Sequence, residues 1–154
     1  NLDGKLEPGP DLDSIPEYNK ENNTTITESS FTVHTPVYDI ISYYCDPFKK
    51  WLGRTHILKF GAGGFFPDHI DNKDDTIGSF RLFVPLQVCN PTDFGYFIYE
   101  DKLLNWKYGS MYFINTCKRH TVFNANLEDD HIVIIMNIKL TEESVKTVIN
   151  FLVS

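Results

Sequence analysis

The stretch SFRLFVPLQV, residues 79–88, predicts a β-strand in the body of the fold. Side chains of a strand point alternately to its two faces. Arg81, Phe83 and Pro85 therefore share one face, and the apolar residues between them share the other. We expect the face that carries Arg81 to point into a barrel.

Further strands are expected on both sides of this segment. Gly, Asn, Asp and Pro lie between the candidate strands, as short β connections require. Many short strands joined by such turns predict a mainly β fold of the jelly-roll type. The other strand candidates are residues 54–60, 94–100, 102–107, 110–115, 119–124 and 131–140.

Helices are expected on either side of the β-rich body. Within residues 36–52, apolar residues recur at helical spacing until Pro47 interrupts them. Residues 141–153 predict an amphipathic helix with Thr141 as its N-cap. Residues 1–30 are polar and contain several Pro and Gly, so we expect an extended arm or a loosely docked lid there.

Length, charge and cysteine content limit the possible functions. A chain of 154 residues is expected to form one domain with a buried core. The formal net charge of −7 and the lack of a Lys/Arg run argue against a nucleic-acid partner, and no apolar run is long enough for a membrane span. The three cysteines are scattered and odd in number, so we expect no disulfide framework and a reducing, cytoplasmic location.

Two short motifs supply candidate metal ligands. In FPDHID, residues 66–71, His69 and Asp71 are two positions apart and point the same way from a strand end. In KRHTVFN, residues 118–124, His120 can complete the set from a neighbouring strand. Two imidazoles and one carboxylate on one face of a metal form the facial triad of non-haem Fe(II) oxygenases. The alternative is that the first two residues lie in an acidic surface loop and that His120 is a core histidine.

The order and spacing of these motifs resemble the Fe(II)/2-oxoglutarate-dependent oxygenases, and most closely their aspartyl/asparaginyl β-hydroxylase branch. The resemblance covers about residues 54–143 and leaves the N-terminal arm aside. It implies a double-stranded β-helix, a cupin-like form of the jelly roll, whose open end holds the iron. The segments that carry the resemblance are GGFFPDHID (63–71), FRLFVPLQV (80–88), NWKYGSMYFINTCKRHTVFN (105–124) and HIVIIMNIKL (131–140).

The resemblance also implies roles for individual residues. His69, Asp71 and His120 match the metal positions of the family, and Arg81 matches an arginine that binds one carboxylate of 2-oxoglutarate. A planar guanidinium suits that contact because it can bind both carboxylate oxygens. The family commonly anchors the distal carboxylate with a further arginine, and His131 occupies that place here. A protonated His131 would be a weaker and pH-dependent anchor, and the alternative is a half-exposed strand residue.

The implied function is an Fe(II)- and 2-oxoglutarate-dependent dioxygenase that hydroxylates a peptide side chain or a small metabolite. Its partners would be 2-oxoglutarate, O₂ and that substrate. Two alternatives remain open. One is a cupin-like metal enzyme that uses the same triad without 2-oxoglutarate, and the other is a jelly-roll protein that binds a metal or ligand without catalysis.

Overall fold

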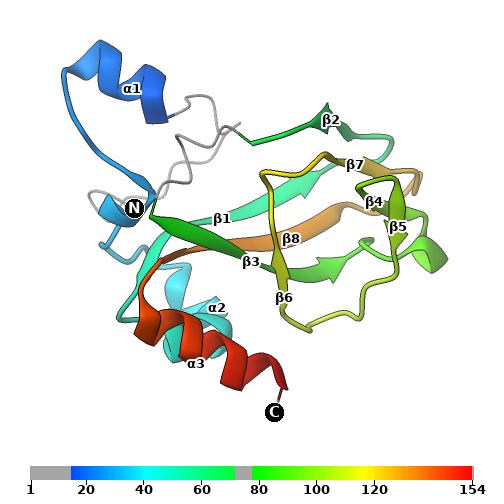
Figure 1. The fold of residues 1–154 in the computed structure, drawn as a ribbon. Helices are drawn as coiled ribbons and strands as arrows, with labels where there is room; N and C mark the ends of the chain where they lie inside the picture. Colours follow the sequence, from blue (N-terminus) through cyan, green and yellow to red (C-terminus); the bar gives the residue numbers. More distant parts are fainter. Residues whose placement is uncertain (1–14, 72–77, 154) are drawn as a thin grey trace. The chain divides into compact units, whose positions relative to one another are not determined.

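The described part of the chain is built mainly of β-strands. The structure, a computed structural model, describes residues 15–71 and 78–153, so residues 1–14 of the expected arm lie outside the described residues. The strands form two antiparallel sheets, which can be followed in Figure 1. The strands are β1 (Leu52–Phe60), β2 (Phe65–His69), β3 (Ser79–Gln87), β4 (Gly95–Tyr99), β5 (Lys102–Leu104), β6 (Tyr112–Ile114), β7 (His120–Asn124) and β8 (His131–Lys139).

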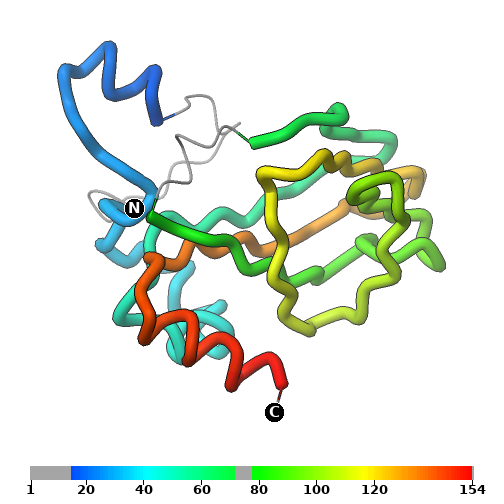
Figure 2. The backbone as a smooth tube through the Cα atoms, in the orientation of Figure 1, coloured from blue at the N-terminus to red at the C-terminus, as the bar shows by residue number. Residues whose placement is uncertain are grey.

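The strand order is that of a jelly roll. One sheet has the order β1-β8-β3-β6 and the other has the order β2-β7-β4-β5. The chain therefore passes repeatedly from one sheet to the other, a path that the tube in Figure 2 shows for β3 to β8. This arrangement confirms the predicted mainly β jelly-roll fold with flanking helices.

The chain divides into two compact units. The jelly-roll unit comprises His56–Asp71 and Arg81–Ile135. The helical unit comprises the described residues of the remaining chain, namely 15–55, 78–80 and 136–153. All five residues that the sequence nominates for the site belong to the jelly-roll unit.

The jelly-roll unit has one hydrophobic core to which both sheets contribute. Phe83 and Val133 come from one sheet, and Phe97 and Val122 come from the other. Trp106, which follows β5, packs its ring against Phe97 with 4.7 Å between the ring centroids. Cys89, Ile114 and Ile135 complete the buried set.

The helical unit contains the three α-helices and confirms the predicted C-terminal helix. The Ser144 backbone N–H donates to Thr141 Oγ1 at 3.0 Å, which is the expected N-cap. Part of the arm forms a helix instead of an extended segment, and Ile15 at its start is buried. Within the described residues, no helix is long and apolar enough to cross a membrane. The helices are α1 (Ile15–Asn22), α2 (Tyr38–Cys45), α3 (Glu142–Val153) and the short 3₁₀ helices Glu28–Ser30, Asp46–Phe48 and Pro91–Asp93.

Candidate metal centre

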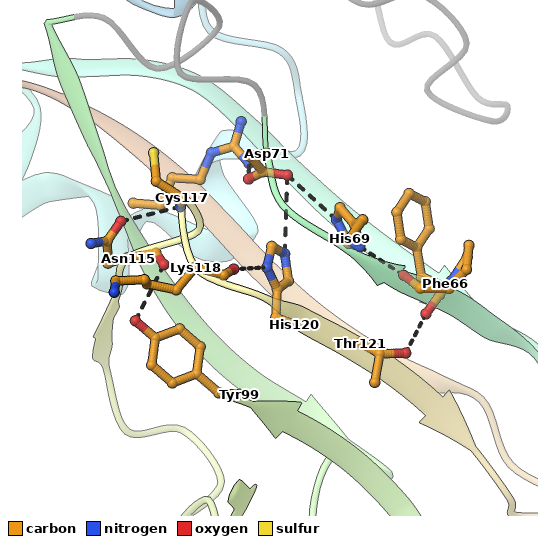
Figure 3. Close-up of polar contacts among 11 residues, drawn as sticks. Phe66, His69, Asp71, Tyr99, Asn115, Cys117, Lys118, His120 and Thr121 are labelled. Carbon is orange, nitrogen blue, oxygen red and sulfur yellow. Dashed lines mark hydrogen bonds and ion pairs between the residues drawn. The ribbon is translucent and has the colours of Figure 1, made fainter. Parts of the chain in front are cut away.

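Strands β2 and β7 bring the two predicted histidine ligands side by side. His69 ends β2, His120 begins β7, and the two residues lie directly opposite each other in the antiparallel pair. Their ring centroids are 4.1 Å apart. Asp71 follows β2. Its backbone N–H donates to the carbonyl of Thr116 at 2.9 Å, and this hydrogen bond holds Asp71 close to the segment that leads into β7. Figure 3 shows the three side chains pointing toward one another.

The donor atoms of these residues form a compact set. Asp71 Oδ1 lies 3.4 Å from His69 Nε2 and 4.0 Å from His120 Nε2. One ligand atom from each of the three residues lies within 4.8 Å of the others. Donors that bind one metal at about 2.1 Å are roughly 3.0–3.4 Å apart, so a shift of about an ångström would bring all three into range. Two nitrogens and one carboxylate oxygen suit a first-row divalent metal.

Backbone carbonyls fix the orientation of both imidazoles. His69 Nδ1 lies 2.7 Å from the carbonyl oxygen of Pro67, and His120 Nδ1 lies 2.8 Å from the carbonyl oxygen of Lys118. A carbonyl oxygen can only accept a hydrogen bond, so Nδ1 carries the proton in both rings. Nε2 is then the ring nitrogen that faces Asp71 in both histidines. Outer contacts of this kind are what orient histidine ligands in metal sites.

The surroundings of His120 keep its ring neutral and therefore able to bind a metal. The ring is buried and stacks on Phe97 of the core, with 5.9 Å between the centroids. Burial lowers the pKa of His120, and the neighbouring His69 and Arg81 act in the same direction. The Lys118 carbonyl and Asp71 oppose this effect but do not reverse it.

Arg81 points to the site, but it contacts a protein carboxylate that sequence reasoning did not assign to it. Its Nη1 donates to Asp71 Oδ2, and both side chains are mostly buried. Arg81 lies in β3, which belongs to the other sheet of the unit, so this ion pair connects the two sheets at the site. The pair occupies one oxygen of Asp71 and leaves Oδ1 facing both histidines. The role of Arg81 as a carboxylate partner of 2-oxoglutarate stays a prediction.

His131 begins β8 as expected, but its surroundings differ from those of a carboxylate anchor. The ring is almost fully buried, and its Nδ1 lies 2.9 Å from the carbonyl oxygen of Val88. It also packs edge-on against Phe60, with 5.5 Å between the centroids. Burial lowers the pKa of His131, against the opposing effect of the Val88 carbonyl. Burial therefore favours the neutral ring, and His131 is not the half-exposed strand residue of the alternative. Its role toward the distal carboxylate stays a prediction.

Two further contacts around the site were not predicted from the sequence. Arg119 pairs with Asp68, so the residues that precede His120 and His69 are themselves joined across β2 and β7. Asn124, at the other end of β7, donates to the backbone carbonyls of Phe60, Gly61 and Asp129 at 2.9–3.1 Å. The Asn124 contacts to Phe60 and Gly61 hold the turn that leads into β2. The only sequence signal for them was the position of charged or amide residues beside the motifs.

Comparison with known proteins finds partial similarity among solved structures. No protein-family model matches the chain, and no curated protein matches it. Among solved structures, a predicted oxalate decarboxylase from Thermotoga maritima is 18% identical with a TM-score of 0.43, over 62% of this chain and 74% of that one. A cupin protein from Bacteroides fragilis is 12% identical with a TM-score of 0.40, over 57% of this chain and 66% of that one. An RmlC-like cupin protein from Desulfovibrio desulfuricans is 20% identical with a TM-score of 0.38, over 57% of this chain and 78% of that one. At these identities the similarity concerns the fold alone.

Proposed function

We propose that the jelly-roll unit binds one Fe(II) ion through His69, Asp71 and His120 and that the protein is a non-haem iron dioxygenase. The observation that supports this most is the convergence of two Nε2 atoms, each with its proton held on Nδ1, on one oxygen of Asp71. Two histidines and one carboxylate leave open positions on Fe(II) and are the donor set of non-haem iron oxygenases. When bound, Fe(II) would supply the activation of O₂ for hydroxylation.

The residues around the triad have distinct tasks in this proposal. The carbonyls of Pro67 and Lys118 hold a proton on Nδ1 of each ring, so that Nε2 is the nitrogen that faces the metal position. Arg81 holds Oδ2 of Asp71, so that carboxylate offers the metal one oxygen and leaves room for other ligands. Phe66 packs edge-on against His69, with 4.4 Å between the centroids, and its exposed ring gives a substrate an apolar surface beside the site.

2-Oxoglutarate is the proposed co-substrate, and a peptide side chain or a small metabolite is the proposed acceptor of the hydroxyl group. The order and spacing of the sequence motifs support this choice. Arg81 could serve as a carboxylate partner for 2-oxoglutarate only by sharing or exchanging its contact with Asp71.

A cupin-like metal enzyme that does not use 2-oxoglutarate is the second candidate, and a specific observation favours it. Both residues expected to hold 2-oxoglutarate are engaged within the protein: Arg81 contacts Asp71, and His131 contacts the Val88 carbonyl. A buried neutral imidazole provides no positive charge for a distal carboxylate.

Calorimetry under anaerobic conditions tests the proposal and separates the two candidates. Fe(II) is titrated into chelator-treated protein, and 2-oxoglutarate is then titrated into the metal-free and Fe(II)-loaded forms. We expect one Fe(II) per chain in the wild type and in the control Glu128→Gln, whose exposed side chain lies in the same unit, and none in Asp71→Ala.

The two titrations distinguish the dioxygenase from the metal enzyme that does not use 2-oxoglutarate. Binding of 2-oxoglutarate to the Fe(II)-loaded form only, with 2-oxoglutarate-dependent O₂ consumption, supports the dioxygenase. Stoichiometric Fe(II) binding without 2-oxoglutarate binding supports the second candidate. Equal Fe(II) binding by the wild type and Asp71→Ala contradicts the proposed metal centre.

A further inference from the structure

A four-residue turn, residues 115–118, connects β6 to the segment that begins with the metal ligand His120. The backbone N–H of Lys118 donates to the carbonyl of Asn115 at 3.0 Å, which closes the turn. The backbone N–H of Cys117 donates to Asn115 Oδ1 at 3.1 Å, so the amide side chain of Asn115 folds back on the turn that it begins. Figure 3 shows this arrangement beside His120. We call residues 115–118 the ligand turn.

Two carbonyls of the ligand turn each hold a different candidate metal ligand. The carbonyl of Thr116, a buried residue, accepts from the backbone N–H of Asp71 at 2.9 Å. The carbonyl of Lys118 accepts from Nδ1 of His120 at 2.8 Å. The two ligands come from segments that are far apart in the sequence. One short turn therefore sets the backbone position of Asp71 and the ring orientation of His120 together.

The hairpin formed by β4 and β5 holds the ligand turn through a further set of hydrogen bonds. The hydroxyl of Tyr99 donates to the carbonyl of Asn115 at 3.3 Å, as Figure 3 shows. A carbonyl oxygen has two lone pairs, so it can accept this bond as well as the one that closes the turn. The backbone N–H of Glu100 donates to the carbonyl of Arg119 at 3.0 Å. Tyr99 lies opposite His120 in the pairing of β4 with β7, so these contacts lie directly beside the metal ligand.

The loop of this hairpin has an unfavourable backbone conformation. Glu100 and Asp101, which connect β4 to β5, have φ angles of +46° and +62°. Two-residue hairpin loops with two positive φ angles usually contain Asn and Gly, because other residues tolerate this region poorly. Such conformations persist where the surrounding structure imposes them, and they are concentrated at functional sites. The hydrogen bond from Glu100 to Arg119 is one contact that holds the loop.

We propose that the ligand turn positions Asp71 and His120 for the metal and that Asn115 and Tyr99 are its positioning residues. Both would act through the carbonyls of the turn, not as metal ligands. The effect on metal binding rests on the proposed function. The effects on the His120 tautomer and on the Asp71 backbone do not, because the contacts that carry them are present without a metal.

Anaerobic titration of Fe(II) into chelator-treated full chain measures the effect on metal binding. Asn115→Ala removes the side-chain acceptor, Asn115→Ser restores a short acceptor, and Tyr99→Phe removes only a hydroxyl. The dissociation constant should rise by about 10-fold in Tyr99→Phe and by up to about 100-fold in Asn115→Ala, the usual range for outer contacts of metal ligands. Asn115→Ser should recover most of the affinity. The control Tyr112→Phe should bind like the wild type, because the hydroxyl that it removes accepts from the backbone N–H of Lys107, outside the turn.

Nuclear magnetic resonance of the metal-free protein supplies a second readout. In the wild type, the ¹⁵N shifts of the His120 ring should show one tautomer with the proton on Nδ1, and the Asp71 amide should exchange slowly. In Asn115→Ala, both tautomers should appear and the Asp71 amide should exchange faster, while the amides of residues 133–135 in β8 keep their wild-type rates. A general loss of stability would instead accelerate exchange throughout the core.

Several outcomes would overturn the inference. One is wild-type Fe(II) affinity together with a single His120 tautomer in both Asn115→Ala and Tyr99→Phe. Another is uniformly faster exchange in Asn115→Ala, and a third is an equal loss of affinity in Tyr112→Phe. If Asn115→Ala does not fold, Tyr99→Phe decides in its place, because it keeps the ring that packs against the core. A wild type that binds no Fe(II) would contradict the proposed function, and the two metal-free measurements would then decide this inference.

Discussion

The buried, neutral state of His131 predicts that it destabilises the fold at acidic pH. Its ring has almost no exposure, its Nδ1 is held by the Val88 carbonyl, and its pKa is lowered by burial. In the unfolded chain the imidazole takes up a proton below about pH 6.5, whereas the folded protein resists protonation there. The unfolded state then binds more protons, so stability falls as pH falls. If the folded ring stays neutral throughout, its contribution between pH 7 and pH 5 is at most on the order of 2 kcal/mol.

His131→Asn isolates this contribution, because an amide can still donate to the Val88 carbonyl but does not titrate. Urea unfolding of chelator-treated protein at pH 7, 6 and 5 gives the free energy of unfolding of each form. The wild type should lose more than the variant between pH 7 and pH 5, by at most on the order of 2 kcal/mol. His34→Asn, at an exposed position, should match the wild type. Equal losses in the wild type and His131→Asn would refute the neutral core histidine and would favour a ring that is already protonated in the fold.

Four further substitutions, one of them with a matched control, test the site and the fold that supports it. His120→Ala should abolish stoichiometric Fe(II) binding in anaerobic calorimetry while the circular dichroism spectrum is retained; undiminished binding would exclude the residue as a ligand. Arg81→Met should weaken Fe(II) binding by about 10- to 100-fold, because Arg81 orients the carboxylate ligand, and the same titration measures it. Asn124→Ala should cost about 2–4 kcal/mol of unfolding free energy in urea, because it removes the hydrogen bonds of a fully buried amide to three backbone carbonyls, and a loss under 1 kcal/mol would contradict this. Gly95→Ala should prevent folding, since its Cβ would lie 1.7 Å from a backbone oxygen, whereas Gly61→Ala, with its nearest neighbour at 3.9 Å, should yield folded protein by circular dichroism.

The strands could be predicted because their local signals agree with the final fold. Apolar segments bounded by Gly, Asn, Asp and Pro became strands, with ends that moved by up to a few residues. The segment 131–140, for example, became β8 and ended one residue earlier. Helix α1 was missed because its sequence, IPEYNKEN, has little apolar periodicity and buries only Ile15. Local composition cannot show that such a polar segment folds.

The candidate site was only partly predictable. The two-residue spacing of His69 and Asp71 placed both on one side of a strand end, and the structure brings His120 beside them. The pairing of Arg81 with Asp71 was missed. Strand alternation predicts the face to which a side chain points, but it does not predict which residue of the other sheet that side chain reaches. The carbonyl contacts that set both tautomers depend on backbone geometry, which no pattern of residue types reports.

The position of β2 at the edge of its sheet has a consequence for folding as well as for binding. β2 pairs with β7 alone in this sheet, most of its residues are exposed, and its ladder is irregular between Phe66 and His69. A slip of one residue would turn His69 away from His120, because side chains alternate along a strand. An ion bound by both histidines would therefore hold the edge strand in its native register. At an ion concentration 100 times the dissociation constant, the bound ion would stabilise the folded form by about 2.7 kcal/mol. Amide hydrogen exchange in β2 should slow accordingly.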